Sequence, residues 1–213
     1  MYRRYIGNES VLLVLFTAIP PDSVFSFHSL APIPAFCYNQ PKKGGVPMKN
    51  METAYFAGGC FWCITPSFRE KEGVYEVISG YSGGPEIDPV YEDVKNQKTG
   101  HRETIRIDYD PSRVTFRELF NLFLVGVDPF DAGGQFIDRG FSYTLAVYYL
   151  SEDQKQTAAD RIRKLEETSG KKVYISLEPF RNFYTAEEYH QNYDLKNPEA
   201  FEKELIESGR KKI

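Results

Sequence analysis

The sequence contains few of the residues from which metal sites and disulfide frameworks are built. Its 213 residues include three cysteines and three histidines, and the histidines stand singly at positions 28, 101 and 190. A structural zinc ion needs about four ligands, and Cys60 and Cys63 form the only close pair of candidates. Three cysteines are also too few for a disulfide framework. We therefore expect no bound metal and no cofactor.

The sequence also lacks a long apolar run and an excess of positive charge. Hydrophobic residues make up 41% of the chain, but no run of them is long enough to span a bilayer. The formal net charge of −4 and the pI near 5.5 argue against nucleic acid as the main partner. We expect a globular monomer without a membrane or nucleic-acid partner.

The first 47 residues differ in composition from the rest. They hold six of the 13 prolines, and their apolar run covers only residues 11–19. A secretory signal peptide, a disordered extension and a mis-annotated leader remain open as interpretations. The last follows from the genetic code, because residues 42–47 (KKGGVP) can be encoded by a stretch containing AAAGGAGGTG, a bacterial ribosome-binding site. Translation would then begin at Met48, residues 48–213 would be the catalytic domain, and the protein would be cytoplasmic.

The stretch Gly58 to Cys63 (GGCFWC) carries the clearest chemical signal. The pattern predicts a strand before it, at residues 53–57, and a helix from Phe61 to about Lys71. The two glycines allow a sharp turn between these elements. Cys60 would lie near the helix N-terminus, where free amide groups favour the thiolate, and it is therefore a candidate nucleophile.

The cysteine pair allows more than one function. A single cysteine after a glycine pair is often buried and inert. Cys63, three residues after Cys60, lies on the same helical face and indicates redox or metal chemistry in an intracellular protein. A general thioredoxin-like dithiol–disulfide oxidoreductase remains open, as does a non-catalytic redox-sensing interaction protein that changes shape when the pair oxidises.

Strands and helices alternate from residue 53 onward, which predicts one mixed α/β domain with a core of roughly residues 53–206. The expected strands are residues 53–57, 74–79, 103–109, 143–150 and 173–178, and the expected helices are residues 61–71, 115–125 and 151–168. Thr115 and Glu118 form a capping-box pattern at the second helix, and Gly170 is expected to end the third.

Glu103 begins the expected strand 103–109. Alternation places it on the same face as Ile105 and Ile107, while Thr104 and Arg106 point to the other face. A glutamate at a strand end is more often solvated, and the pattern alone leaves this alternative open. If the carboxyl group lies on the core side, burial raises its pKa.

Several separated motifs follow one another in an order that resembles the A-type peptide methionine sulfoxide reductases. They are Gly59-Cys60-Phe61-Trp62, Gly80-Tyr81-Ser82-Gly83-Gly84, Pro89-Val90-Tyr91-Glu92-Asp93-Val94, Gly100-His101-Arg102-Glu103, Asp110-Pro111 and Glu188-Tyr189-His190-Gln191. The resemblance spans about Thr53 to Pro198 and includes nothing in residues 1–47. It implies the family's fold, a ferredoxin-like α+β plait.

The resemblance also implies a reaction. Cys60 would attack the sulfur of the S epimer of methionine sulfoxide in oxidised proteins or peptides, release methionine and become a sulfenic acid. Glu103 would protonate the sulfoxide oxygen, with help from the hydroxyl groups of Tyr91 and Tyr143.

The remaining family roles concern substrate binding. Phe61 and Trp62 would hold the substrate's methyl group. Asp138 matches the loop aspartate that orients the substrate and the active-site network. On residue patterns alone, the tyrosines and Asp138 would be interpreted as packing and turn residues.

This sequence departs from many members of the family at two places. Cys63 stands where many members have glycine, and no cysteine follows it, whereas many members carry recycling cysteines near the C-terminus. Similarity to the Cys-Phe-Trp-Cys variety of the family implies that Cys63 resolves the sulfenic acid of Cys60. Thioredoxin or a similar dithiol would then reduce the resulting disulfide.

Overall fold

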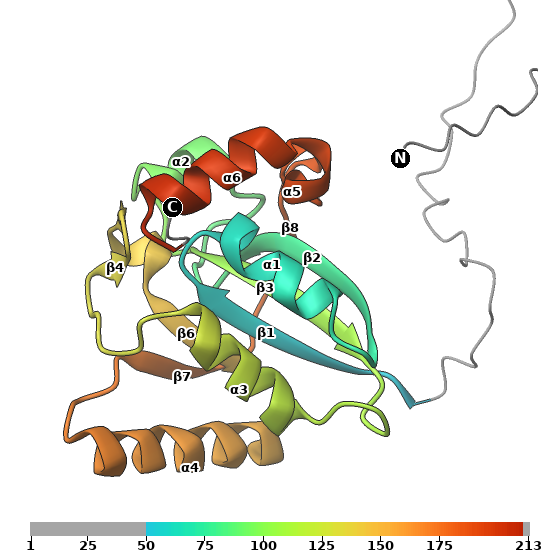
Figure 1. Ribbon diagram of the computed structural model, residues 1–213, viewed down its shortest axis with the longest axis vertical. Coiled ribbons are helices and arrows are strands. Elements are labelled where there is room, and N and C mark those ends of the chain that lie inside the picture. Colours follow the sequence, from blue (N-terminus) through green and yellow to red (C-terminus); the bar gives the residue numbers. More distant parts are fainter. Residues whose placement is uncertain (1–49, 211–213) are drawn as a thin grey trace, which may run out of the picture. The chain divides into compact units, whose positions relative to one another are not determined.

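The computed structural model describes residues 50–210, so the predictions for residues 1–47 lie outside the described residues (Figure 1). The strands are β1 (Glu52–Gly58), β2 (Val74–Ser82), β3 (Arg102–Tyr109), β4 (Gly134–Gln135), β5 (Asp138–Arg139), β6 (Leu145–Tyr149), β7 (Ile175–Pro179) and β8 (Tyr184–Thr185). The helices are α1 (Phe61–Arg69), α2 (Tyr91–Lys95), α3 (Phe116–Gly126), α4 (Glu152–Ser169), α5 (Tyr193–Lys196) and α6 (Pro198–Glu207), with 3-10 turns η2 (Phe141–Tyr143) and η3 (Glu188–His190). No helix within residues 50–210 is both long and apolar enough to cross a membrane.

The main sheet has the strand order β7-β6-β1-β3-β2-β8. Its four central strands follow the chain order β1-α1-β2-β3-α3-β6 and pair with one another in antiparallel fashion. This βαββαβ arrangement is the ferredoxin-like plait, which confirms the predicted α+β class. Helix α4 then leads to β7, which pairs in parallel with β6 at one edge, and β8 pairs with β2 at the other. Strands β4 and β5 form a separate hairpin.

Apolar side chains cover both faces of the sheet. Figure 1 shows α1 and α3 against one face, where Phe56 of β1 packs on Phe123 with ring centroids 5.0 Å apart. Burying a phenylalanine side chain contributes about 1.5–3 kcal/mol, so this cluster supplies a large part of the core's stability. On the opposite face, Tyr55 stacks on Phe180 at 4.3 Å. Both layers hold β1 in place, and β1 leads directly to the cysteine motif.

Local signals predicted most helix ends. The capping box is present: Glu118 donates its backbone N–H to the Thr115 hydroxyl, and the Glu118 carboxylate accepts the Thr115 N–H. Gly170 ends α4 in the left-handed conformation. Helix α1 stops at Arg69, two residues earlier than predicted.

The prediction of a strand from residue 143 to residue 150 was wrong at its start. Tyr143 belongs to the 3-10 turn η2, and β6 begins at Leu145. A contact distant in sequence stabilises the turn, because Ser142 donates its N–H to the side chain of Gln97 at 3.0 Å. The alternating pattern of residues 143–150 could not reveal that Gln97 holds this turn. Tyr143 therefore lies in the turn and not in the strand.

Gly59 makes the turn from β1 into α1 with a positive φ of 76°. A Cβ atom at this position would lie 2.6 Å from the Cβ of Gln135. The Gln135 side chain cannot easily move away, because it is fully buried and hydrogen-bonds both the N–H and the C=O of Asp128. The entry to α1 therefore requires glycine for both its backbone angle and its lack of a side chain.

We predict that Gly59→Ala destabilises the protein more than Gly170→Ala does. Gly170 also has a positive φ, of 66°, but a Cβ there would meet nothing within 4 Å. Gly170→Ala should therefore lower the free energy of unfolding by only the left-handed backbone cost, about 1–2 kcal/mol. Gly59→Ala adds the collision with Gln135. Urea denaturation measures both, and equal losses would show that the close approach to Gln135 costs nothing.

Candidate active site

Cys60 and Cys63 lie together at the start of α1. Cys60 is the N-cap residue of the helix and is 6% exposed, and Cys63 donates its backbone N–H to the Cys60 carbonyl at 3.1 Å. Both cysteines are free thiols. Their side chains share a hydrogen bond, so the two thiols ionise as one coupled pair.

The predicted preference for a Cys60 thiolate does not hold in the free protein. The hydrogen bond with Cys63 raises the pKa of Cys60 well above its ordinary value, and burial and the nearby Glu103 and Asp138 act in the same direction. The same hydrogen bond lowers the pKa of Cys63, despite its burial. The position at the helix N-terminus is therefore outweighed at Cys60, and the negative charge of the pair is favoured on Cys63.

Glu103 lies directly beside the first turn of α1. Its carboxylate oxygen Oε2 accepts the backbone N–H of Phe61 at 3.1 Å, and its side chain is almost fully buried. Burial raises the pKa of Glu103 to about 8, although the hydrogen bonds from Phe61 and Tyr143 oppose the rise. The predicted core-side orientation and the raised pKa are both confirmed. A carboxylic acid that keeps its proton near neutral pH thus lies next to the cysteine pair.

Two tyrosines approach Glu103 from separate elements. Tyr143 reaches it from η2 and donates a hydrogen bond to its carboxylate, while Tyr91 begins α2. Burial raises the pKa of both tyrosine hydroxyls, and the charge of Glu103 raises each further. Both hydroxyls therefore remain protonated and able to donate at neutral pH.

Asp138, in β5, completes the group of polar residues. Its charge acts on both cysteines and on Glu103, so it faces the same space. Burial raises the pKa of Asp138, and its Oδ2 atom is shielded from solvent without a hydrogen-bond partner among the described residues. This unsatisfied acceptor could receive a donor from a bound molecule.

Phe61 and Trp62 form an aromatic wall beside the cysteines. Phe61 is buried, with its ring 6.3 Å from that of Trp62. Trp62 is only partly buried and stacks on Tyr193 of α5, with centroids 3.8 Å apart and planes 7° from parallel. All eight residues expected at the site therefore come from the same neighbourhood: Cys60, Phe61, Trp62, Cys63, Tyr91, Glu103, Asp138 and Tyr143.

His190 is a site residue for which no role was predicted. Its Nδ1 atom accepts the indole N–H of Trp62 at 3.1 Å, and its ring packs on Tyr91 at 4.3 Å. Burial lowers the pKa of His190 to about 4, so the ring is neutral near pH 7 and Nδ1 can act as an acceptor. The motif containing His190 could be recognised in the sequence. The contact of His190 with Trp62, 128 residues away, could not be predicted from it.

Glu187 was not predicted either, because its contacts are also with residues distant in sequence. Its carboxylate accepts the Tyr81 hydroxyl at 2.7 Å and the backbone N–H of Tyr91 at 2.9 Å. These hydrogen bonds lower the pKa of Glu187, although partial burial opposes them. A charged Glu187 thereby ties β2, α2 and the C-terminal region together around the aromatic wall.

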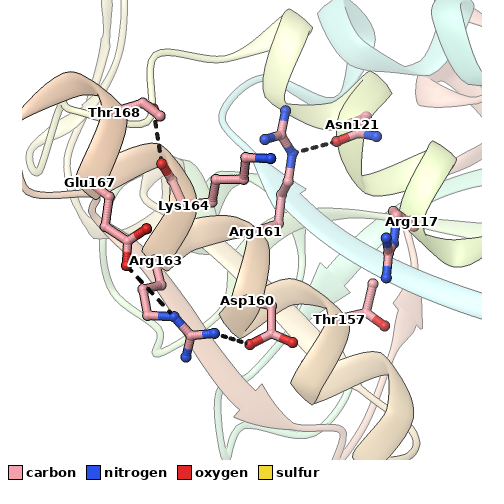
Figure 2. A pocket seen from close by; sticks show the side chains of 9 residues that line it. All are labelled: Arg117, Asn121, Thr157, Asp160, Arg161, Arg163, Lys164, Glu167 and Thr168. Atoms are coloured by element: carbon pink, nitrogen blue, oxygen red, sulfur yellow. Dashed lines mark hydrogen bonds and ion pairs between the residues drawn. The ribbon is translucent and has the colours of Figure 1, made fainter.

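A separate hollow of about 660 Å³ lies between α3 and α4 (Figure 2). Charged and polar side chains line it, and Figure 2 shows Arg163 directed at Asp160 and Glu167. None of the eight expected site residues lines this hollow. Within residues 50–210 no group of three or more His, Cys, Asp and Glu side chains could hold a metal ion.

A buried thiol and a partly buried thiol at a helix N-terminus, next to a carboxylic acid with a raised pKa, form a site of the kind that thiol-dependent oxidoreductases use. The family model described as peptide methionine sulfoxide reductase matches residues 52–213. The chain belongs to this family.

Individual relatives agree with the family assignment. The chain is 44% identical over 161 residues to peptide methionine sulfoxide reductase MsrA of Bacillus velezensis, covering 75% of this chain and 91% of the relative. It is 43% identical over 150 residues to MsrA of Picrophilus torridus, covering 70% and 84%. Among solved structures, reduced Mxr1 from Saccharomyces cerevisiae is similar with a TM-score of 0.68 at 29% identity, over 74% of this chain and 92% of that one. Methionine sulfoxide reductase A of Corynebacterium diphtheriae is similar with a TM-score of 0.65 at 28% identity, over 71% and 77%.

Proposed function

We propose that this protein reduces the S epimer of methionine sulfoxide, in oxidised proteins and peptides, to methionine through Cys60. The observation that carries the proposal is the buried Glu103 carboxyl group beside the cysteine pair, with a pKa raised to about 8. A sulfoxide oxygen leaves poorly unless it gains a proton as the thiolate attacks, and an ordinary glutamate has lost its proton at neutral pH. A thiol–disulfide exchange enzyme does not have to protonate a leaving sulfoxide oxygen.

The first step would move the sulfoxide oxygen to Cys60. Once the pair has lost one proton, its remaining proton shifts from Cys60 to Cys63 along their hydrogen bond, which puts the thiolate on Cys60. This thiolate attacks the substrate sulfur while Glu103 protonates the oxygen. The substrate S–O bond then breaks, the hydroxyl group passes to the Cys60 sulfur, and the transient bond between the two sulfurs breaks. Methionine is released and Cys60 becomes a sulfenic acid, so the substrate sulfur is reduced by two electrons and the Cys60 sulfur is oxidised by two.

Tyr91 and Tyr143 would support this step by donating hydrogen bonds to the same oxygen. Both hydroxyls keep their protons because burial raises their pKa values. Phe61 and Trp62 would hold the substrate's methyl group against the aromatic wall, and Asp138 would accept a donor from the substrate through its unpartnered oxygen.

The second step would restore the enzyme. Cys63 attacks the sulfenic sulfur of Cys60, an S–S bond forms, the S–O bond breaks, and the oxygen leaves as water. Their positions three residues apart on the first turn of α1 suit this intramolecular reaction. Thioredoxin or a similar dithiol would then reduce the disulfide.

The direct test of this function is reduction of N-acetylated methionine sulfoxide of defined configuration. We expect the S epimer to be reduced with either dithiothreitol or thioredoxin, and the R epimer to be left unchanged. Reduction of insulin disulfides without any sulfoxide reduction would instead identify a general dithiol oxidoreductase. An absence of turnover with every substrate would favour a redox sensor.

Two cysteine variants serve as controls in the same assay. Cys60→Ser should abolish activity with either reductant, because it removes the nucleophile. Cys63→Ser should release about one equivalent of methionine per enzyme and then stall as a sulfenic acid when thioredoxin is the only reductant. Continued thioredoxin-driven turnover in Cys63→Ser would rule out its resolving role.

We predict that Glu103→Gln slows single-turnover methionine release by about 100-fold or more, because the amide cannot transfer the proton. In the unchanged protein the rate should fall as the pH rises through about 8, since Glu103 then loses the proton that it must donate. It should also fall in acid, where the cysteine pair is fully protonated. The variant should keep only the acid limb, so that its rate rises steadily with pH. A bell-shaped profile at near-unchanged rates in Glu103→Gln would exclude Glu103 as the donor.

Residues 48–213 should suffice for this activity, because every residue of the proposed site lies after residue 59 and the family model begins at residue 52. With translation starting at Met48, the protein would act in the cytoplasm, as a monomer. A protein that begins at Met48 should have the same melting temperature and the same rate of sulfoxide reduction as the full chain. A marked loss of either would assign a structural or catalytic role to residues 1–47.

A further inference from the structure

Arg210, just beyond α6, carries a guanidinium group that lies inside the protein. Its Nε and both Nη atoms are shielded from solvent, and none has a hydrogen-bond partner among residues 50–210. The group lies over the ring of Phe136, with Cζ 4.3 Å from the ring centroid. A guanidinium group is always charged, and burying it without a partner is costly. A negative charge close to this guanidinium group would therefore be stabilised.

The guanidinium group lies beside the cysteine motif. Its Nη2 atom is 3.5 Å from the position that a Cβ atom would take on Gly59, the residue before Cys60. Figure 1 agrees, because the end of the chain after α6 lies beside β4 and the turn that enters α1. Arg210 thus borders the site on the side of the C-terminal region, and Lys95 of α2 is a second cation whose charge acts on Asp138 and Glu204.

Five ionisable groups share the electrostatic environment of Cys63: Cys60, Glu103, Asp138, Glu204 and Arg210. The carboxylates of Asp138 and Glu204 oppose a negative charge on Cys63, and Arg210 favours one. Arg210 forms no ion pair with either carboxylate among the described residues, so neither neutralises it directly.

We propose that Arg210 is a positioning residue for the resolving step, and that its guanidinium group holds Cys63 as the thiolate that attacks the sulfenic acid of Cys60. The inference rests on the proposed function, because resolution follows sulfoxide reduction. In this step the Cys63 thiolate forms the S–S bond, and the hydroxide that leaves Cys60 takes up a proton to become water. Arg210 offsets the carboxylates around Cys63, which would otherwise favour the less reactive thiol.

The first experiment measures the ionisation of Cys63 without any sulfoxide. In a protein with Cys37→Ser and Cys60→Ser, Cys63 is the only thiol, and its rate of alkylation by iodoacetamide across pH reports the thiolate. Adding Arg210→Gln should raise the midpoint by about one pH unit, because an adjacent positive charge is lost. Arg210→Lys keeps the positive charge, so its alkylation midpoint should lie close to that of the protein with Arg210.

A matched control removes a positive charge from the exposed face of the same region. Lys203 lies on α6 with its side chain 74% exposed, and Lys203→Gln should leave the midpoint unchanged. If Arg210→Gln shifts the midpoint no more than Lys203→Gln does, the proposal is overturned. This readout does not require sulfoxide reduction, so it separates a failure of the proposal from a failure of the proposed function.

The second experiment follows resolution in the protein with all its cysteines. After one equivalent of the S sulfoxide, a dimedone-type reagent traps Cys60 while it is a sulfenic acid. In Arg210→Gln the sulfenic acid should persist about tenfold longer before the disulfide forms, in line with a one-unit rise in the pKa of Cys63. A lifetime equal to that in Lys203→Gln would contradict the proposal, even if Arg210→Gln were less stable.

Discussion

The hydrogen bond from the Phe61 N–H to Glu103 joins the two halves of the site. It connects the first turn of α1 to the start of β3, and so places a carboxyl group and a cysteine pair side by side although Phe61 and Glu103 are 42 residues apart in sequence. Both ends of this bond depend on the sheet. Antiparallel pairing of β1 with β3 fixes where α1 starts relative to Glu103. The aromatic core under α1 then keeps the helix from moving away.

Burial of this region gives each ionisable group a different protonation state. Burial opposes a charge on either group, so Glu103 keeps its proton and His190 stays neutral. Glu187 remains charged, because it accepts donors from Tyr81 and Tyr91. Two glutamates of the same intrinsic acidity and a histidine thereby act as proton donor, structural anion and hydrogen-bond acceptor within one small volume.

The fold and much of the site could be predicted from short-range signals. The Thr115 capping box, the Gly170 terminus and the inward side of Glu103 each depend on residues close in sequence, and all three are present. The motif register of the family placed the tyrosines and Asp138. What could not be predicted depends on contacts between distant segments, as between Gln97 and the turn at Tyr143. The raised pKa of Cys60 arises from its hydrogen bond with Cys63, from burial and from the charges of Glu103 and Asp138. The position of Cys60 at a helix N-terminus does not by itself predict this combination.

The stack of Trp62 on Tyr193 has a consequence for how the protein can be observed. Trp62 is the chain's single tryptophan, so the near-ultraviolet emission of the whole protein comes chiefly from one indole at the edge of the site. That indole contacts a neutral imidazole on one side and a phenol ring on another, both of which alter its excited state. Any molecule that enters against the aromatic wall must change this emission. The protein thus carries an intrinsic optical reporter that needs no label.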